Sequence, residues 1–223
     1  MSHSADDLAA MAAAAFTPHH ALAIRLLPHA LGGGDGAHDV AHLLRVWKNA
    51  RAIQAAEGGD GELLAAAVLL HDAVTVEKNS PQRAQASRLA ADAARDRLAA
   101  EGWPQERIAA VAHAIVAHSF SAGVAPQTLE ARILQDADRL DAIGAVGVAR
   151  CFYVAGRLGS LLYDPFDSEG EARPLDDRRF ALDHFKTKLM HLASGFQTAT
   201  GATLARERHE RLLRFWREMR DEI

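Results

Sequence analysis

The stretch LLAAAVLLHD, residues 63–72, places an apolar run of eight residues directly before a histidine and an aspartate. Alanine and leucine favour helix, and a helix that is apolar all round is expected to be buried. Ionisable groups seldom lie at the inner end of such a helix unless they are paired or bind a metal ion. Since adjacent residues point in different directions from a helix, we expect His71 and Asp72 to reach one shared ion rather than each other.

The rest of the chain also favours helix. Alternating patterns typical of strands are nearly absent, and segments rich in glycine or proline separate the helical runs. The sequence therefore predicts an all-α fold in a single domain, residues 1–223, with its longest loop at residues 163–177. Helices are expected at residues 18–31, 37–57, 61–72, 81–102, 104–119, 126–159 (bent near 144–147), 176–193 and 202–221.

Composition limits the classes of partner and location. The formal net charge of −4 over 223 residues gives no electrostatic case for a nucleic acid polymer or an anionic membrane as main partner. The single cysteine, Cys151, excludes a disulfide framework. Acidic residues precede the short apolar stretch near the N-terminus, unlike a secretory signal, and no apolar run approaches the ~20 residues of a membrane span. We expect a cytoplasmic protein, and the sequence carries no indication of its oligomeric state.

Two further segments place ionisable groups in apolar helical context. In HDVAHLLRV, residues 38–46, the side chains of His38, His42 and Arg45 share one helix face. In ILQDADRLDAIG, residues 133–144, three aspartates accompany an apolar stripe: Asp136, Asp138 and Asp141. Imidazole and carboxylate ligands together suit Mn, Fe, Co, Ni or Zn, and carboxylates also suit Mg. The residues alone predict a metal site, but they leave open which aspartate takes part, and a solvated, salt-bridged face is the alternative.

These motifs resemble the HD-domain superfamily of metal-dependent phosphohydrolases, and more narrowly the bacterial single-domain HD hydrolases. The shared pattern is a histidine on one helix, a His-Asp doublet at the end of a later helix and an aspartate on a further helix. The likeness covers nearly the whole chain. It includes VEKNSPQRAQAS (76–87), AHSFS (117–121), and the C-terminal HFKTKL (184–189) with the pattern T..G..LA.ER (198–208).

The resemblance implies a helical bundle of the HD type that holds one divalent ion, with Mn, Mg, Fe, Co, Ni and Zn all open. The implied ligands are His42, His71, Asp72 and Asp138. Asp138 is selected because the metal-binding aspartate of the family directly precedes a basic residue, which is Arg139 here. The implied activity is hydrolysis of a phosphorylated small molecule, with a nucleotide favoured, by a phosphatase or pyrophosphohydrolase in which a metal-activated water is the nucleophile.

Further roles follow from the same resemblance and from chemistry. Candidates for proton transfer are Asp72, His118 and Glu77. Cationic side chains are needed to hold phosphate groups. The candidates for substrate binding are Lys78, Arg139, Arg45 and Lys188.

The sequence also departs from better-defined branches of the superfamily. HD 5′-nucleotidases and (p)ppGpp hydrolases carry a glutamate three residues after the doublet; here that residue is Thr75, with Glu77 two further along. Two-metal HD proteins supply two more histidines. His113 and His118 are five residues apart, about 140° around a helix, so we do not expect them to share an ion. Two alternatives stay open: a di-iron HD-type oxygenase and a non-catalytic nucleotide-binding regulatory module.

Overall fold

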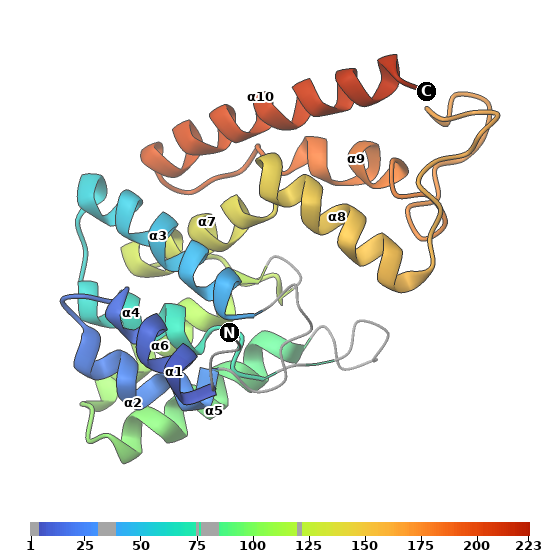
Figure 1. Ribbon diagram of the computed structural model, residues 1–223. Helices are drawn as coiled ribbons and strands as arrows, with labels where there is room; N and C mark the ends of the chain where they lie inside the picture. Colours follow the sequence, from blue (N-terminus) through green and yellow to red (C-terminus); the bar gives the residue numbers. More distant parts are fainter. Residues whose placement is uncertain (1–4, 31–38, 75, 77–84, 120–121) are drawn as a thin grey trace. The chain divides into compact units, whose positions relative to one another are not determined.

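The computed structural model describes residues 5–30, 39–74, 76, 85–119 and 122–223. Within these ranges the chain is helical and has no strand; an isolated bridge pairs Leu161 with Phe180. The expected all-α class is confirmed. The α-helices, labelled in Figure 1, are α1 (Ala5–Ala14), α2 (His20–Ala30), α3 (Val40–Glu57), α4 (Gly61–Leu70), α5 (Ala86–Ala100), α6 (Gln105–His118), α7 (Leu129–Asp141), α8 (Gly144–Leu158), α9 (Asp183–Thr187) and α10 (Ala199–Asp221). A short 3-10 helix, η3 (Leu189–His191), follows α9.

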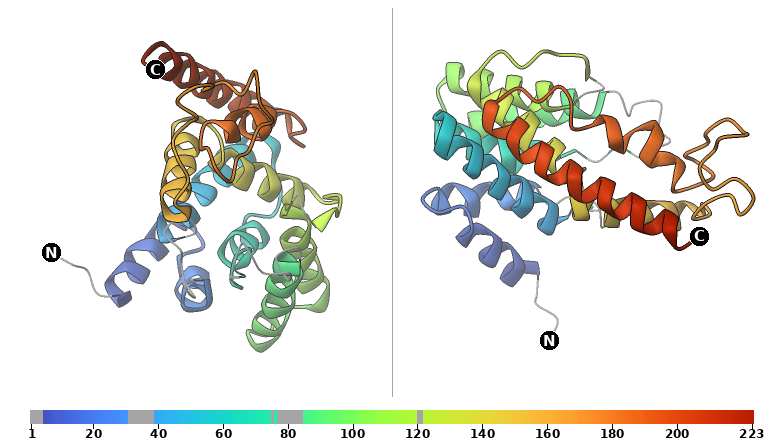
Figure 2. Two further views of the ribbon diagram at one scale, coloured as in Figure 1. Left: turned by 90° about the vertical axis from the view of Figure 1, so that its right-hand side faces the viewer. Right: turned by 90° about the horizontal axis from the view of Figure 1, so that it is seen from above.

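The chain divides into two compact units, Met1–Asp138 and Arg139–Ile223, with the division inside α7. The expectation of a single domain stays a prediction. In the first unit α4 packs against α2, α3, α5 and α6, and α5 lies along α6 (Figures 1 and 2). Every residue of α4 from Leu63 to Leu70 is buried, as the apolar run predicts. Asp60 caps this helix, since its Oδ1 accepts hydrogen bonds from the backbone N–H groups of Glu62 and Leu63, both at 3.0 Å.

The second unit is built around its own apolar cluster. The long helix α10 packs against α8 and η3, and α9 follows directly into η3 (Figure 2). The buried members of the cluster come from all of these elements and from the loop before α9. They are Val148, Leu182, Phe185, Leu189, Leu212 and Trp216.

The single bent helix expected at residues 126–159 is wrong, because the structure has two helices, α7 and α8, with residues 142–143 between them. The reason lies in Gly144, the first residue of α8, which has a φ of 74°. This left-handed value lies outside the helical range and is readily adopted only by glycine. The inner stripe expected across this region is nevertheless buried, with Ile133, Ala137 and Leu140 at 0% exposure.

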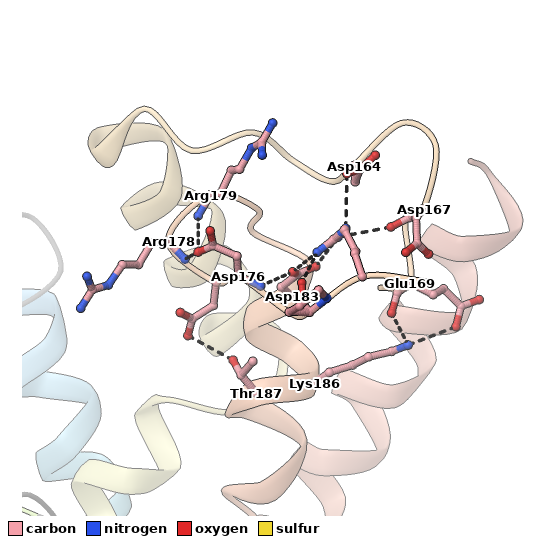
Figure 3. A network of polar contacts seen from close by, with 12 residues as sticks. Asp164, Asp167, Glu169, Asp176, Arg178, Arg179, Asp183, Lys186 and Thr187 are labelled. Carbon is pink, nitrogen blue, oxygen red and sulfur yellow. Dashed lines mark hydrogen bonds and ion pairs between the residues drawn. The ribbon is translucent and has the colours of Figure 1, made fainter. Parts of the chain in front are cut away.

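The expected helix at residues 176–193 is also wrong over its first half. Only the short α9 and η3 are regular there. Asp176 instead forms a turn in which its Oδ1 accepts from the N–H groups of Arg178 (3.1 Å) and Arg179 (3.3 Å), as Figure 3 shows. These bonds cap a single turn. The helix does not continue from it because the backbone N–H groups of Ala181 and Leu182 donate to the carbonyl oxygens of Leu161 and Leu162 (2.8 and 2.9 Å).

Within the part of the chain that the structure describes, no helix is both long and apolar enough to cross a bilayer.

Candidate metal centre

The backbone at the end of α4 orients the imidazole of His71. Its Nδ1 lies 2.7 Å from the carbonyl oxygen of Val68, one of the last four carbonyls of the helix, which lack an intrahelical partner. Because a carbonyl only accepts, Nδ1 must carry the hydrogen. In the neutral ring Nε2 then presents a lone pair, as a metal ligand requires.

The electrostatic surroundings favour this neutral form. Burial lowers the pKa of His71. This effect is larger than that of the Asp72 carboxylate, which raises the pKa. The neighbouring imidazoles of His118 and His42 lower it further, whereas Asp138 raises it. With a pKa below the ordinary 6.5, His71 is neutral at pH 7 and its Nε2 is available to a cation.

His42 meets His71 from the first turn of α3. Asp39 caps α3 by accepting a hydrogen bond from the backbone N–H of His42 at 2.9 Å. The Nε2 atoms of His42 and His71 are 3.4 Å apart. An oxygen of Asp72, Oδ2, lies 3.7 Å from the first nitrogen and 3.6 Å from the second. These three residues therefore offer ligand atoms that all lie within 4.8 Å of one another.

Asp138 brings a fourth donor from the last turn of α7. Its Oδ1 lies 3.6 Å from Nε2 of His42. Donor atoms that bind one ion at about 2.0–2.2 Å lie roughly 3.0–3.5 Å apart, so the separations of 3.4–3.7 Å need only a few tenths of an ångström of closure. His42, His71 and Asp72 thus fit a divalent ion, and the part of Asp138 as a fourth ligand stays a prediction. The other two candidates are placed differently: Asp136 is fully buried, and Asp141 is paired with Arg150 at 2.9 Å.

The site has a buried side and an open side. The side chains of His42 and His71 are 3% and 1% exposed, whereas those of Asp72 and Asp138 are 40% and 31% exposed. A cation bound there would have the buried imidazoles of His42 and His71 on one side and the solvent-exposed carboxylates of Asp72 and Asp138 on the other. His71 and Asp72 directly follow the C-terminal turn of α4, and Asp138 lies in that of α7; helix C-termini favour positive charge.

His118 faces the same carboxylate from the end of α6. Its Nδ1 lies 2.6 Å from the carbonyl oxygen of Ile115, and its Nε2 lies 3.9 Å from Oδ1 of Asp72. As in His71, the carbonyl requires the hydrogen on Nδ1. Nε2 of His118 therefore accepts a proton when the ring is neutral and donates one only when the ring is protonated. His113 points elsewhere, because its Nε2 accepts from the backbone N–H of Gln127 at 3.0 Å; the two histidines do not share a site, as their spacing predicts.

The remaining sequence candidates lie on other parts of the chain or outside the described residues. Glu77 and Lys78 fall outside them, as do Thr75 and His38. Arg45 is half-buried on α3, three residues after His42.

Arg139 and Lys188 belong to the second unit. Nη1 of Arg139 donates to the carbonyl oxygens of Ser194 (3.3 Å) and Gly195 (3.0 Å), and the guanidinium lies 5.7 Å from the centre of the Phe196 ring. Lys188 is exposed at the end of α9. Their roles in substrate binding stay predictions.

Three further residues of this region were not among the candidates that the sequence motifs indicate. Asp39 was detectable, since an aspartate three residues before a buried histidine is a typical N-cap pattern. Asn49 and Gln135 are buried amides that donate to backbone carbonyls of other helices. No short-range pattern marks them, because their partners lie 88 and 18 residues away in the chain.

Comparison with known proteins identifies the family of this chain. A family model described as HD domain matches residues 40–143. The uncharacterized protein YpgQ of Bacillus subtilis is 35% identical over 193 residues, which cover 85% of this chain and 86% of YpgQ. The chain belongs to the HD-domain superfamily.

Solved structures of HD-superfamily proteins share the fold. The crystal structure of YpgQ in complex with ADP matches with a TM-score of 0.68 and 30% identity, covering 97% of each chain. An HD-superfamily hydrolase from Bacillus thuringiensis matches with a TM-score of 0.67 and 29% identity, covering 95% of this chain and 96% of that one. This HD-domain protein therefore has the fold of HD-superfamily hydrolases over nearly its whole length.

Proposed function

We propose that this HD-domain protein is a metal-dependent phosphohydrolase that acts on a nucleotide, as a phosphatase or a pyrophosphohydrolase. The observation that carries the proposal is the meeting of two imidazole nitrogens, from His42 and His71, with a carboxylate oxygen of Asp72 within 4.8 Å. The ADP bound by YpgQ, a relative of similar length, supports a nucleotide as the substrate class.

One divalent ion is held by four side chains in this proposal: His42, His71, Asp72 and Asp138. The mixed nitrogen and oxygen set suits Mn, Fe, Co, Ni or Zn, and it admits Mg less readily because Mg prefers oxygen ligands. A bound ion of this kind lowers the pKa of water and offsets negative charge that develops on a phosphoryl group.

Side chains of the protein then transfer the proton of the attacking water. Oδ2 of Asp72 faces the two imidazoles, so Oδ1 is turned toward His118. Oδ1 accepts a proton from the attacking water, and Nε2 of His118, 3.9 Å away, relays it. In its protonated form His118 donates from Nε2 to the leaving oxygen. Glu77 is a further candidate base.

Phosphate groups remote from the reacting bond require cations. Arg139 directly follows the proposed ligand Asp138, and Arg45 follows the proposed ligand His42 by three residues. Lys78 and Lys188 are the other proposed contacts. Arginine suits this role because its guanidinium can form two parallel hydrogen bonds to one phosphate.

The experiment is a screen of phosphorylated metabolites with protein loaded separately with Mn, Mg, Co, Ni, Fe or Zn, with release of phosphate and of pyrophosphate both measured. We expect turnover of a nucleotide that depends on the ion and is lost on addition of a chelator and in the Asp138→Ala variant. Metal-loaded protein that binds a nucleotide but releases neither product would instead support a regulatory module. Two irons per chain with oxygen-dependent product formation would support an oxygenase.

A further inference from the structure

Two buried primary amides connect the helices that carry the proposed ligands. Asn49 on α3 is 4% exposed and Gln135 on α7 is 6% exposed. Nδ2 of Asn49 donates to the carbonyl oxygen of Ala137 at 2.9 Å, and Nε2 of Gln135 donates to that of Ala117 at 2.7 Å. A buried amide costs free energy unless it is hydrogen-bonded, so both bonds constrain where the helices can lie.

The first bond joins α3 to α7 beside Asp138. Asn49 follows His42 by seven residues, about 700° around the helix, so the two side chains share one face of α3. Its acceptor, Ala137, is the residue immediately before Asp138. The same pair of helices places Nε2 of His42 3.6 Å from Oδ1 of Asp138. A slide of α7 along α3 would break the amide bond and separate these two ligand atoms together.

The second bond joins α7 to the end of α6. Gln135 precedes Asp138 by one turn, and its acceptor Ala117 precedes His118. The carbonyl of Ala117 is among the last four of α6, which have no partner within the helix, and Ala117 is fully buried. Gln135 therefore supplies a hydrogen bond that water does not readily replace, and this bond constrains how α7, which carries Asp138, lies against the end of α6, which carries His118.

We propose that Asn49 and Gln135 are positioning residues, which hold α3, α6 and α7 in the register that lets His42, Asp138 and His118 act around one cation. The proposal rests on the metal site of the proposed function. Neither amide touches the ion in this account. Apolar residues of the same size would fill the same space but would leave the register unspecified and a buried carbonyl unpaired.

The test compares Mn²⁺ affinity, measured by calorimetry on folded protein, in two near-isosteric variants, Asn49→Leu and Gln135→Met. Loss of a residue that orients metal ligands typically weakens metal binding by about 10- to 100-fold, and we expect a loss in that range for Asn49→Leu. For Gln135→Met we expect a smaller loss of Mn²⁺ affinity, with a fall in kcat at saturating metal. The matched control is Ile108→Ala, a cavity variant at the opposite end of α6 from His118, which lowers thermal stability.

A role limited to stability predicts that all three variants lower the melting temperature and none alters Mn²⁺ affinity. Affinities within twofold of wild type for both amide variants would therefore overturn the proposal. If the Asn49→Leu variant does not fold, the Mn²⁺ affinity of the Gln135→Met variant alone decides the test. Wild-type protein that binds Mn²⁺ without hydrolysing any nucleotide would defeat the proposed function but leave this test intact. Wild-type protein that binds no divalent ion would defeat both.

Discussion

At the scale of single residues, the hydrogen bond of one imidazole nitrogen determines what the other nitrogen can do. His71 and His118 each follow the last turns of a buried helix, and each gives its Nδ1 hydrogen to the carbonyl three residues earlier. Both Nε2 atoms therefore face the acidic side chains with a lone pair when neutral. The two histidines differ in their neighbours. Nε2 of His71 lies 3.4 Å from Nε2 of His42, whereas Nε2 of His118 lies 3.9 Å from the outer oxygen of Asp72 and its ring packs edge-on against the His71 ring at 5.0 Å.

This difference predicts separable effects of two substitutions. His118→Gln removes the group that exchanges a proton with Asp72, so we expect kcat to fall by about 10²- to 10⁴-fold while Mn²⁺ affinity changes little. His71→Gln removes a ligand and should abolish Mn²⁺ binding itself. Steady-state kinetics with calorimetry checks both. If His118→Gln lost the ion as completely as His71→Gln, His118 would be a ligand and not a proton carrier.

Cys151 gives a second prediction at this scale. Burial, with the nearby Asp177 carboxylate, raises the pKa of its thiol to about 11. At pH 8 only about one thiol in a thousand is then ionised, roughly 100-fold fewer than at the ordinary value, and the thiolate is the reactive form. We expect alkylation by iodoacetamide, followed by mass spectrometry, to be slow in native protein and fast in urea. Equal rates in both conditions would show that the thiol is accessible and normally acidic.

At the scale of helices, the local patterns predict most elements but not their breaks. The ends of α3 and α6 fall within a few residues of expectation because Asp39, Pro104 and the glycines at 58 and 59 act locally. The break after α7 depends on a positive φ at Gly144. A glycine in the sequence does not reveal which φ it adopts, because it adopts positive and negative values about equally well. The missing first half of the helix at 176–193 depends on distant partners instead, since the N–H groups of residues 181 and 182 donate to the carbonyls of residues 161 and 162, and the Asp183 carboxylate binds Arg173.

One of these partners yields a prediction for the loop before α9. The buried carboxylate of Asp183 accepts two hydrogen bonds from Arg173, at 2.6 and 2.9 Å, and a third from the backbone N–H of Asp176 at 2.6 Å. Lys186 and Glu169 form a neighbouring pair (Figure 3). We expect Asp183→Ala to lower the melting temperature by several degrees, because it removes the three hydrogen bonds of a buried carboxylate, two of them from a charged arginine.

The control for this prediction is Glu207→Gln on α10, which removes an exposed ion pair with Arg211 at 4.0 Å. Pairs of this kind contribute little, so the melting temperature should stay within about 1 °C of wild type. Differential scanning calorimetry measures both variants. An Asp183→Ala protein as stable as the control would mean that the Arg173 contacts do not hold the loop.

At the scale of the whole molecule, the motif residues identify the superfamily and most of the geometry. His42, His71, Asp72 and Asp138 are separated by up to 96 positions, yet the fold brings them together because α3, α4 and α7 each carry one part of the pattern. The amides that hold those helices together were not predictable, since nothing within a few residues of Asn49 or Gln135 reveals its partner. The substrate was equally unpredictable, because the motif supplies metal ligands and not the groups that distinguish one phosphorylated molecule from another.

The central claim is that four side chains from three helices bind one divalent ion. The most direct measurement is the stoichiometry and affinity of Mn²⁺ by calorimetry for wild type, for Asp138→Ala, and for Asp92→Ala, which changes an exposed aspartate of α5. We predict that wild type and Asp92→Ala each bind one Mn²⁺ ion per chain, and that a folded Asp138→Ala protein shows no measurable binding. Wild-type affinity retained in Asp138→Ala, or no ion bound by wild type, would contradict it.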